Sequence, residues 1–158
     1  MTKPVSPALD PAQVPEQSTS GYPEIYRARV AGRHRRRLGD GAGLKNFGVN
    51  LVTLDPRSES SMRHWHAKQD EFIYVLEGEL TLITNAGRQT LRAGMAAGFP
   101  AGRADGHQLV NETDRPATYL EVGDRTPDDN VAYPDVDLAA GMVGAKWVFT
   151  HKDGRPYE

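Results

Sequence analysis

Short stretches of hydrophobic and β-branched residues recur along the chain, each ended by a glycine, a proline or a polar turn. Their spacing of about 8–12 residues is typical of an all-β sandwich or barrel. Outside residues 57–77, no stretch free of both Gly and Pro exceeds nine residues. Helices of average length, about eleven residues, therefore have almost no room. We expect strands at 24–30, 47–54, 61–66, 71–77, 79–84, 89–92, 95–99, 107–111, 117–122 and 147–150.

Two segments lack this pattern. Residues 1–20 contain four prolines among Ser, Thr and Gln and no aromatic residue, so we expect a flexible N-terminal leader. Residues 124–144 are polar and interrupted by proline, which favours a loop lying over the barrel. Residues 21–158 are then one β-barrel domain, in which the segment after the loop forms a C-terminal extension.

The charge and the composition exclude several classes of protein. The 158 residues contain 19 Lys and Arg against 21 Asp and Glu, so a protein-wide basic surface for nucleic acid is excluded. The absence of cysteine excludes disulfide frameworks, thiolate zinc sites and cysteine nucleophiles. No apolar run reaches 18 residues and no signal-peptide core follows Met1. We therefore expect a cytoplasmic protein that has no membrane partner.

Six arginines within residues 27–37 are a local exception to this charge balance. Such a run could form a nucleic-acid-binding arm. Acidic residues elsewhere balance its charge and no aromatic residue lies within it, so we favour a solvated strand edge or a contact between subunits.

The candidate chemistry lies in His64-Trp65-His66. Side chains two apart in a strand share a face, so both imidazoles point the same way and Trp65 points away. Two neutral imidazoles on one face are suited to bind a metal ion. Glu71 begins the next expected strand and His107 begins a later one. His34 and His151 lack such spacing, so we expect them at the surface.

The spacing of these residues resembles the two motifs of the cupin family. The first motif is matched by His64, His66, Glu71 and Gly78, with Ser58 at the position where the family has glycine. The second is matched by Gly94, Pro100, Gly102, His107 and Asn111, with two more residues than the family pattern between Gly102 and His107. The resemblance extends over residues 47–122.

The resemblance implies a double-stranded β-helix jelly roll with one divalent metal ion. By the family pattern the ligands are His64, His66, Glu71 and His107. Asp70 is the alternative carboxylate, and we favour Glu71. Three nitrogens and one oxygen suit Zn, Mn, Fe, Ni or Co. The alternative is a cupin that has lost its metal.

The resemblance also implies three functions. The first is a metal-dependent enzyme that acts on a small polar or anionic molecule, as sugar-phosphate isomerases and epimerases do. The second is an Fe(II) dioxygenase, and the third is a non-catalytic binding or sensing module. Arg103, near the expected barrel mouth, is a candidate for binding an anionic substrate. No residue has a spacing that identifies a general base.

The apolar surface predicts assembly. Trp65, Phe72, Tyr74 and Leu76 lie on faces opposite the expected ligands. Residues 147–150 add two aromatic rings after a long loop. Leaving large apolar side chains in water is unfavourable by about 1.5–3 kcal/mol each. We therefore expect a homodimer.

Overall fold

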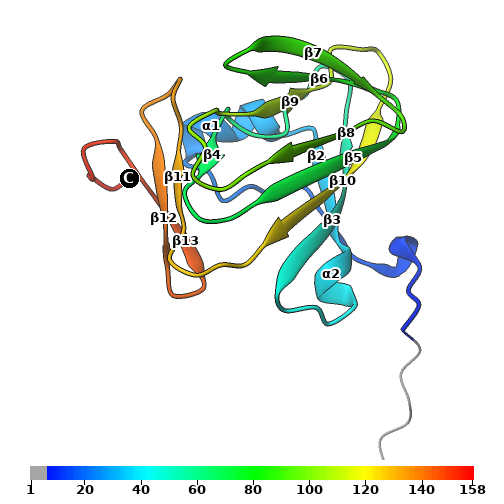
Figure 1. Ribbon diagram of the computed structural model, residues 1–158, viewed down its shortest axis with the longest axis horizontal. Helices are drawn as coiled ribbons and strands as arrows, with labels where there is room; N and C mark the ends of the chain where they lie inside the picture. Colours follow the sequence, from blue (N-terminus) through cyan, green and yellow to red (C-terminus); the bar gives the residue numbers. More distant parts are fainter. Residues whose placement is uncertain (1–6) are drawn as a thin grey trace, which may run out of the picture.

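Antiparallel β-strands form most of the regular structure in the computed structural model, which describes residues 7–158 (Figure 1). A six-stranded sheet has the order β1-β2-β3-β10-β5-β8, a three-stranded sheet the order β7-β6-β9, and a four-stranded sheet the order β13-β12-β11-β4. The strands are β1 (Glu16–Gln17), β2 (Arg33–Arg37), β3 (Phe47–Leu54), β4 (Trp65–His66), β5 (Glu71–Glu77), β6 (Glu79–Thr84), β7 (Gly87–Arg92), β8 (Ala96–Phe99), β9 (Gln108–Val110), β10 (Ala117–Asp124), β11 (Asn130–Ala132), β12 (Ala139–Val143) and β13 (Lys146–Thr150). The helical elements are η1 (Pro11–Gln13), α1 (Glu24–Arg27), η2 (Ala28–Val30) and α2 (Leu38–Gly41).

The first hydrophobic core joins the six-stranded and the three-stranded sheets. It takes alternate residues from each strand, as the period of two requires. Val52 and Leu54 come from β3, and Leu80 and Leu82 from β6. This alternation confirms the expected all-β architecture and the predicted bounds of β3, β5 and β6.

A second core lies under the four-stranded sheet, which occupies the left of Figure 1. Its buried residues are Tyr22, Val30, Met62, Val131, Tyr133, Leu138 and Ala140. Phe149 of β13 packs beside Tyr22, with ring centroids 5.3 Å apart. The C-terminal strand is therefore covered in part by its own chain.

Two secondary-structure predictions were wrong. Residues 24–30 form α1 and η2 instead of a strand. The spacing of Gly and Pro excluded only helices of average length, and one short turn fits between Pro23 and Gly32. Tyr26 N donates to the Pro23 carbonyl oxygen at 3.0 Å, while the missing N–H of Pro23 costs nothing before a helix.

The expected loop at 124–144 contains β11 and β12. Small residues such as Ala139 and Gly141 have weak strand preference, so the sequence hides these strands. Pairing with β4 and β13 forms them nonetheless. The predicted strand at 61–66 is correspondingly shorter, because only β4 and a bridge between His64 and His107 are regular.

The segment expected as a flexible leader lies partly outside the described residues, which exclude 1–6. Within it, β1 pairs with β2 in the six-stranded sheet. Arg36 Nη1 also donates to the Val14 carbonyl oxygen at 2.5 Å. This part of the segment is therefore held against the barrel.

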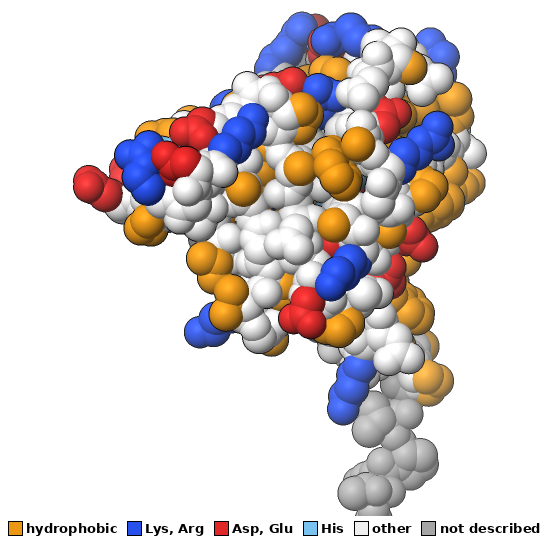
Figure 2. All heavy atoms as spheres, turned by 60° about the vertical axis from the view of Figure 1, so that its left-hand side comes forward, with side chains coloured by type: hydrophobic (Ala, Val, Ile, Leu, Met, Phe, Trp, Pro, Cys, Tyr) orange, Lys and Arg blue, Asp and Glu red, His pale blue; other side chains and the backbone are white. Residues whose placement is uncertain are grey.

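Four of the six arginines of the run lie in β2, between β1 and β3, while Arg27 lies in α1 and Arg29 in η2. On the face shown in Figure 2, Lys and Arg side chains are interspersed with Asp and Glu and with hydrophobic residues.

No helix within residues 7–158 has the length and apolar character needed to cross a membrane.

Candidate metal centre

Three segments bring the expected ligands to one place. His64 and His107 face each other across a short antiparallel bridge, in which His107 N donates to the His64 carbonyl oxygen at 2.8 Å. His66 lies in β4, and Glu71 is the first residue of β5. The pairing of backbones therefore places all four side chains around one interior point.

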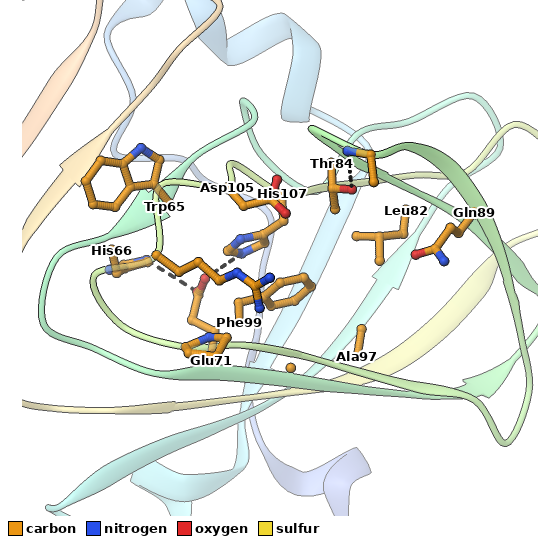
Figure 3. A pocket seen from close by; sticks show the side chains of 14 residues that line it. Trp65, His66, Glu71, Leu82, Thr84, Gln89, Ala97, Phe99, Asp105 and His107 are labelled. Atoms are coloured by element: carbon orange, nitrogen blue, oxygen red, sulfur yellow. Dashed lines mark hydrogen bonds and ion pairs between the residues drawn. The ribbon is translucent and has the colours of Figure 1, made fainter.

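Three imidazole Nε2 atoms surround the carboxylate of Glu71. Figure 3 shows two of these imidazoles, those of His66 and His107, on either side of Glu71. The distances are 3.5 Å from His64 to Oε2, 3.4 Å from His66 to Oε1 and 2.5 Å from His107 to Oε2. One ligand atom each from His64, His66 and Glu71 lies within 4.8 Å of the others. His107 is outside that group of three, although it contacts Glu71.

The second nitrogen of two imidazoles is held by the protein. His64 Nδ1 donates to the Met62 carbonyl oxygen at 2.8 Å. His66 Nδ1 donates to Asp129 Oδ2 at 2.5 Å, and Asp129 Oδ1 accepts from Lys68 N at 2.7 Å. These bonds leave both Nε2 atoms free to face Glu71, as a metal ligand requires.

Asp129 is a residue that the sequence reasoning missed. It is fully buried, and it lies 63 residues from its partner His66. Asp129 directly precedes β11, and β11 pairs with β4, with Val131 opposite His66. Since β11 was not expected, no local pattern could identify this contact.

The residues present fit a divalent metal ion. Glu71 Oε2 is buried, and its neighbours are the Nε2 atoms of His107 and His64, neither of which gives it a hydrogen bond of acceptable geometry. Imidazole nitrogens and a carboxylate oxygen that face one another are donor atoms that a divalent cation binds. The His107 ring stacks on Phe99 at 3.6 Å between centroids, so its orientation is fixed by the barrel wall. Three nitrogens and one oxygen suit Zn, Mn, Fe, Ni or Co.

Electrostatics favour an ionised Glu71. Burial alone would raise the pKa of this carboxyl, but His107, His64 and His66 hold it well below its usual value. Burial alone would lower the pKa of His66, whereas Glu71 and Asp129 raise it to about 9. Burial lowers the pKa of His107 despite its contact with Glu71. A metal ion would have to displace the proton of His66.

Two cavities meet at this cluster. A cavity of about 270 Å³ and another of about 900 Å³ both touch His66, Glu71 and His107. The exposed Arg103, the candidate for binding an anionic substrate, lines the smaller one. A small molecule in either cavity would reach the cluster.

The smaller cavity corrects the expectation for Trp65. The side chain was expected to point away from the ligands, yet it lines this cavity together with His66 (Figure 3). Because β4 has only two residues, strand alternation is not sustained there. Trp147 of β13 lies close by, with its ring 5.9 Å from that of His66.

The remaining candidates lie elsewhere. Asp70 is exposed, and its Oδ1 accepts a hydrogen bond from Ala101 N at 2.7 Å, outside the donor group. His34 pairs with Asp55 at 2.9 Å and His151 with Asp137 at 2.8 Å.

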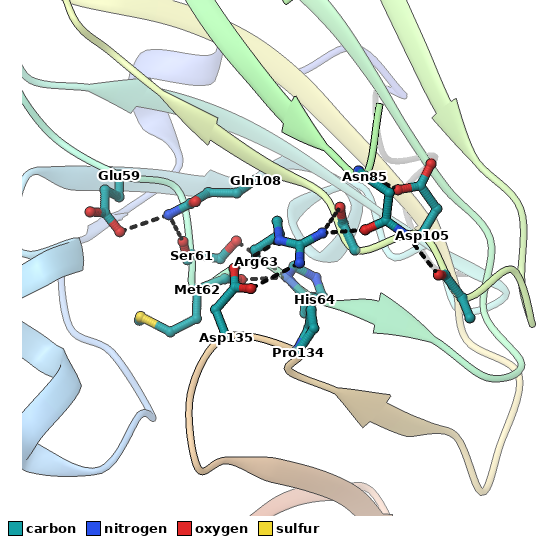
Figure 4. Close-up of polar contacts among 12 residues, drawn as sticks. Glu59, Ser61, Met62, Arg63, His64, Asn85, Asp105, Gln108, Pro134 and Asp135 are labelled. Atoms are coloured by element: carbon teal, nitrogen blue, oxygen red, sulfur yellow. Dashed lines mark hydrogen bonds and ion pairs between the residues drawn. The ribbon is translucent and has the colours of Figure 1, made fainter. Parts of the chain in front are cut away.

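Arg63 fixes the lengthened loop before His107 (Figure 4). Its Nε and Nη2 donate to Asp135 at 2.8 and 2.9 Å. Its Nη1 donates to Asn85 Oδ1 at 2.6 Å and to the Gly106 carbonyl oxygen at 3.2 Å. Asp105 accepts from Asn85 N at 2.7 Å. The loop is therefore attached to the turn between β6 and β7.

Comparisons with known proteins agree with this geometry. A family model described as a cupin domain matches residues 50–123. A sugar phosphate isomerase of the cupin superfamily from Silicibacter pomeroyi is 45% identical, with a TM-score of 0.92 over 96% of both chains. A putative sugar phosphate isomerase from Acidithiobacillus ferrooxidans is 29% identical, with a TM-score of 0.72 over 78% of this chain and 80% of that one.

A more distant solved structure shows the fold alone. The polyketide cyclase RemF from Streptomyces resistomycificus is 21% identical, with a TM-score of 0.63 over 86% of this chain and 87% of that one. No curated protein matches the chain.

Proposed function

The chain belongs to the cupin superfamily, and on that premise we propose that it is a divalent-metal-dependent isomerase of a small phosphorylated sugar. The observation that carries the proposal is the convergence of three imidazole Nε2 atoms on the buried Glu71 carboxylate. The substrate class is supported by two similar chains described as sugar phosphate isomerases, one of them 45% identical over 96% of both lengths.

In this proposal the metal ligands are His64, His66, Glu71 and His107. A bound divalent ion would act as a Lewis acid that polarises a carbonyl or hydroxyl group of the sugar. The chain orients these ligands through Met62, Asp129 and Phe99, which fix three of the four side chains. Such support keeps a site in its working geometry without rearrangement.

The substrate occupies the larger cavity in this proposal. The larger cavity, of about 900 Å³, lies within the range of small-molecule sites, about 300 to 1,000 Å³, and gives a phosphorylated sugar more room than the cavity of about 270 Å³. Tyr22 and Tyr133 line the larger cavity, and burial raises the pKa of both phenols. They remain protonated and can donate hydrogen bonds to hydroxyl oxygens of a sugar.

The reaction can be tested by proton exchange. An isomerase that moves a carbonyl between adjacent carbons by proton transfer can exchange a carbon-bound hydrogen with solvent. The metal-loaded protein is incubated in D₂O with a panel of aldose and ketose phosphates, and deuterium incorporation is followed by NMR. We expect incorporation with the wild type and with His34→Ala, and none with His66→Ala, which also loses the metal.

The same panel distinguishes the other functions. A dioxygenase would consume O₂ with an organic substrate, and a binding module would bind a sugar phosphate without exchange. Loaded protein that neither exchanges a carbon-bound hydrogen nor converts any member of the panel into its isomer contradicts the proposal.

We also propose a homodimer. The outer face of β5 presents Phe72, Tyr74 and Leu76, each between 39% and 45% exposed. Three neighbouring apolar side chains on one sheet face are typical of an interface. The C-terminal strand adds less to this argument than the sequence indicated, because Phe149 packs within its own chain.

A further inference from the structure

The strand β2 carries cationic side chains on both of its faces. Strand alternation places Arg33, Arg35 and Arg37 on one face, and His34 and Arg36 on the other. The two faces meet very different surroundings.

The face of Arg35 looks into the barrel. Arg35 lies opposite Val52 of β3, and Val52 lies opposite Tyr119 of β10. Directly opposite residues of antiparallel strands project to the same side of a sheet. Val52 and Tyr119 are buried core residues, so Arg35 points inward as they do.

The same interior face carries the metal centre. Tyr119 lies opposite Val75 of β5, and Glu71 is four residues before Val75. Arg35 is three strand spacings, about 14 Å, from Val75 across the sheet, and Glu71 lies about 13 Å from Val75 along β5. Arg35 and Glu71 both line the 900 Å³ cavity. They can therefore contact opposite ends of one ligand.

The outward face of β2 is neutralised by acidic partners. Arg36 Nη2 lies 3.1 Å from Glu16 Oε2. His34 lies 2.9 Å from Asp55 and 3.5 Å from Glu16. These contacts give the outward cations an ordinary structural role.

On the inward face, Arg33 and Arg35 lack such acidic partners among residues 7–158, and only Arg37, at the exposed end of the strand, has one. Arg33 donates to a neutral acceptor, the Ser60 carbonyl oxygen, at 2.6 Å. Arg35 Nε is buried and makes no hydrogen bond with any residue of the described chain. Neither side chain forms an ion pair within 4.0 Å among residues 7–158. Arg37 lies 3.7 Å from Asp40.

The charge on Arg35 is unfavourable as it stands. Burial lowers the pKa of its guanidinium, and Arg33 and Arg37 lower it further, while Glu121 opposes them. A half-buried cation whose Nε has no hydrogen-bond partner costs stability. A side chain that lowers stability in this way is typical of a functional site, and for a cation that function is binding an anion.

We propose that Arg35, with Arg33 beside it, binds the phosphate group of the substrate while the sugar reaches the metal centre. A phosphate monoester carries a charge of about −1.5 to −2 at neutral pH, which two guanidinium groups match. Arginine also offers paired N–H donors that fit phosphate oxygens. The assignment of a sugar as the rest of the substrate rests on the proposed function. Binding of the phosphate group can be tested without turnover.

Calorimetry with glycerol 3-phosphate tests this site. The full chain is stripped with EDTA and dialysed, so that no metal ion contributes to phosphate binding. We expect Arg35→Gln to bind at least about tenfold more weakly than the wild type, because a hydrogen bond to a charged group is lost. Arg36→Gln, on the opposite face of the same strand, is the matched control and keeps the wild-type affinity. Glycerol alone should not bind.

A stability measurement separates binding from a structural role. Arg35→Met removes a half-buried charge without an ion-pair partner and retains an unbranched apolar side chain, so its Tm should equal or exceed that of the wild type. A lower Tm for Arg35→Met, equal affinities of Arg35→Gln and Arg36→Gln, or no glycerol 3-phosphate binding by the wild type would each overturn the inference. Phosphate binding that depends on Arg35 in a protein without isomerase activity would refute the proposed reaction and leave the anion site standing.

Discussion

Replacement of Asp129 by Asn tests how the protein holds its candidate metal centre. Asp129 Oδ2 accepts a 2.5 Å hydrogen bond from His66 Nδ1, and its side chain is fully buried. Asn keeps the shape but loses the charge, so its amide can face His66 with either oxygen or NH₂. The Asn side chain therefore fixes the orientation and the tautomer of the His66 ring less strongly, so Nε2 faces the metal in a smaller fraction of the molecules.

The magnitude follows from the kind of bond that is lost. Groups that orient a metal-bound histidine change metal affinity by about 10–100-fold when they are mutated. The same bond is a charge-assisted one, worth about 1.5–3 kcal/mol to stability. The pKa of His66 should also fall from about 9 toward its ordinary value, because Asp129 is one of the groups that raise it.

The assay is competition with a chromophoric chelator for Zn²⁺, together with urea unfolding of the metal-free protein. The matched control is Asp137→Asn, which alters another His–Asp pair at 2.8 Å, that of His151 at the surface. Asp137→Asn should leave metal affinity unchanged. Equal metal affinities for Asp129→Asn and the wild type would refute the role of Asp129 in orienting His66.

Three further predictions concern acid, the N-terminal segment and assembly. Bound metal should decrease as the pH falls and be lost by about pH 4, because a protonated imidazole does not coordinate a metal ion. Dialysis at stepped pH followed by metal analysis checks this. Deletion of residues 1–17 removes β1 and both partners of Arg36, so thermal unfolding should show a Tm lower by a few degrees, and an unchanged Tm would contradict the docking of β1. Light scattering should give about twice the 17.4 kDa chain mass, and Phe72→Asp should shift the mass toward the monomer; a wild-type monomer would contradict the dimer.

The sequence predicted the strands that have a strong alternating pattern. Glu71–Glu77 and Glu79–Thr84 are strands with the predicted bounds, since β-branched and aromatic residues alternate along them. The spacing of His64 and His66 also predicted a shared site, which the structure brings together with Glu71 and His107. Local rules suffice where the periodicity is strong and the ligands lie at strand ends.

What the sequence did not predict depends on contacts between distant segments. Asp129 meets His66 only because β11 pairs with β4. The two faces of β2 look alike in sequence, since both carry cations. They differ only because Glu16 and Asp55 reach one face and the barrel interior covers the other. The order of charged residues along the sequence does not show which face of a strand has ion-pair partners.

The position of the candidate metal centre also explains why both cores are needed. His107 stacks on Phe99, which packs against the first core, while His64 lies beside Tyr133 of the second core, with ring centroids 5.7 Å apart. A change that loosens either core therefore moves one ligand relative to the others. Because a metal site depends on geometry to within a fraction of an ångström, the four-stranded C-terminal sheet belongs to the functional unit although the cupin-domain match ends at residue 123. Residues 50–123 contain all four proposed ligands, but they lack Asp129, which is hydrogen-bonded to His66, and Tyr133, whose ring lies beside that of His64.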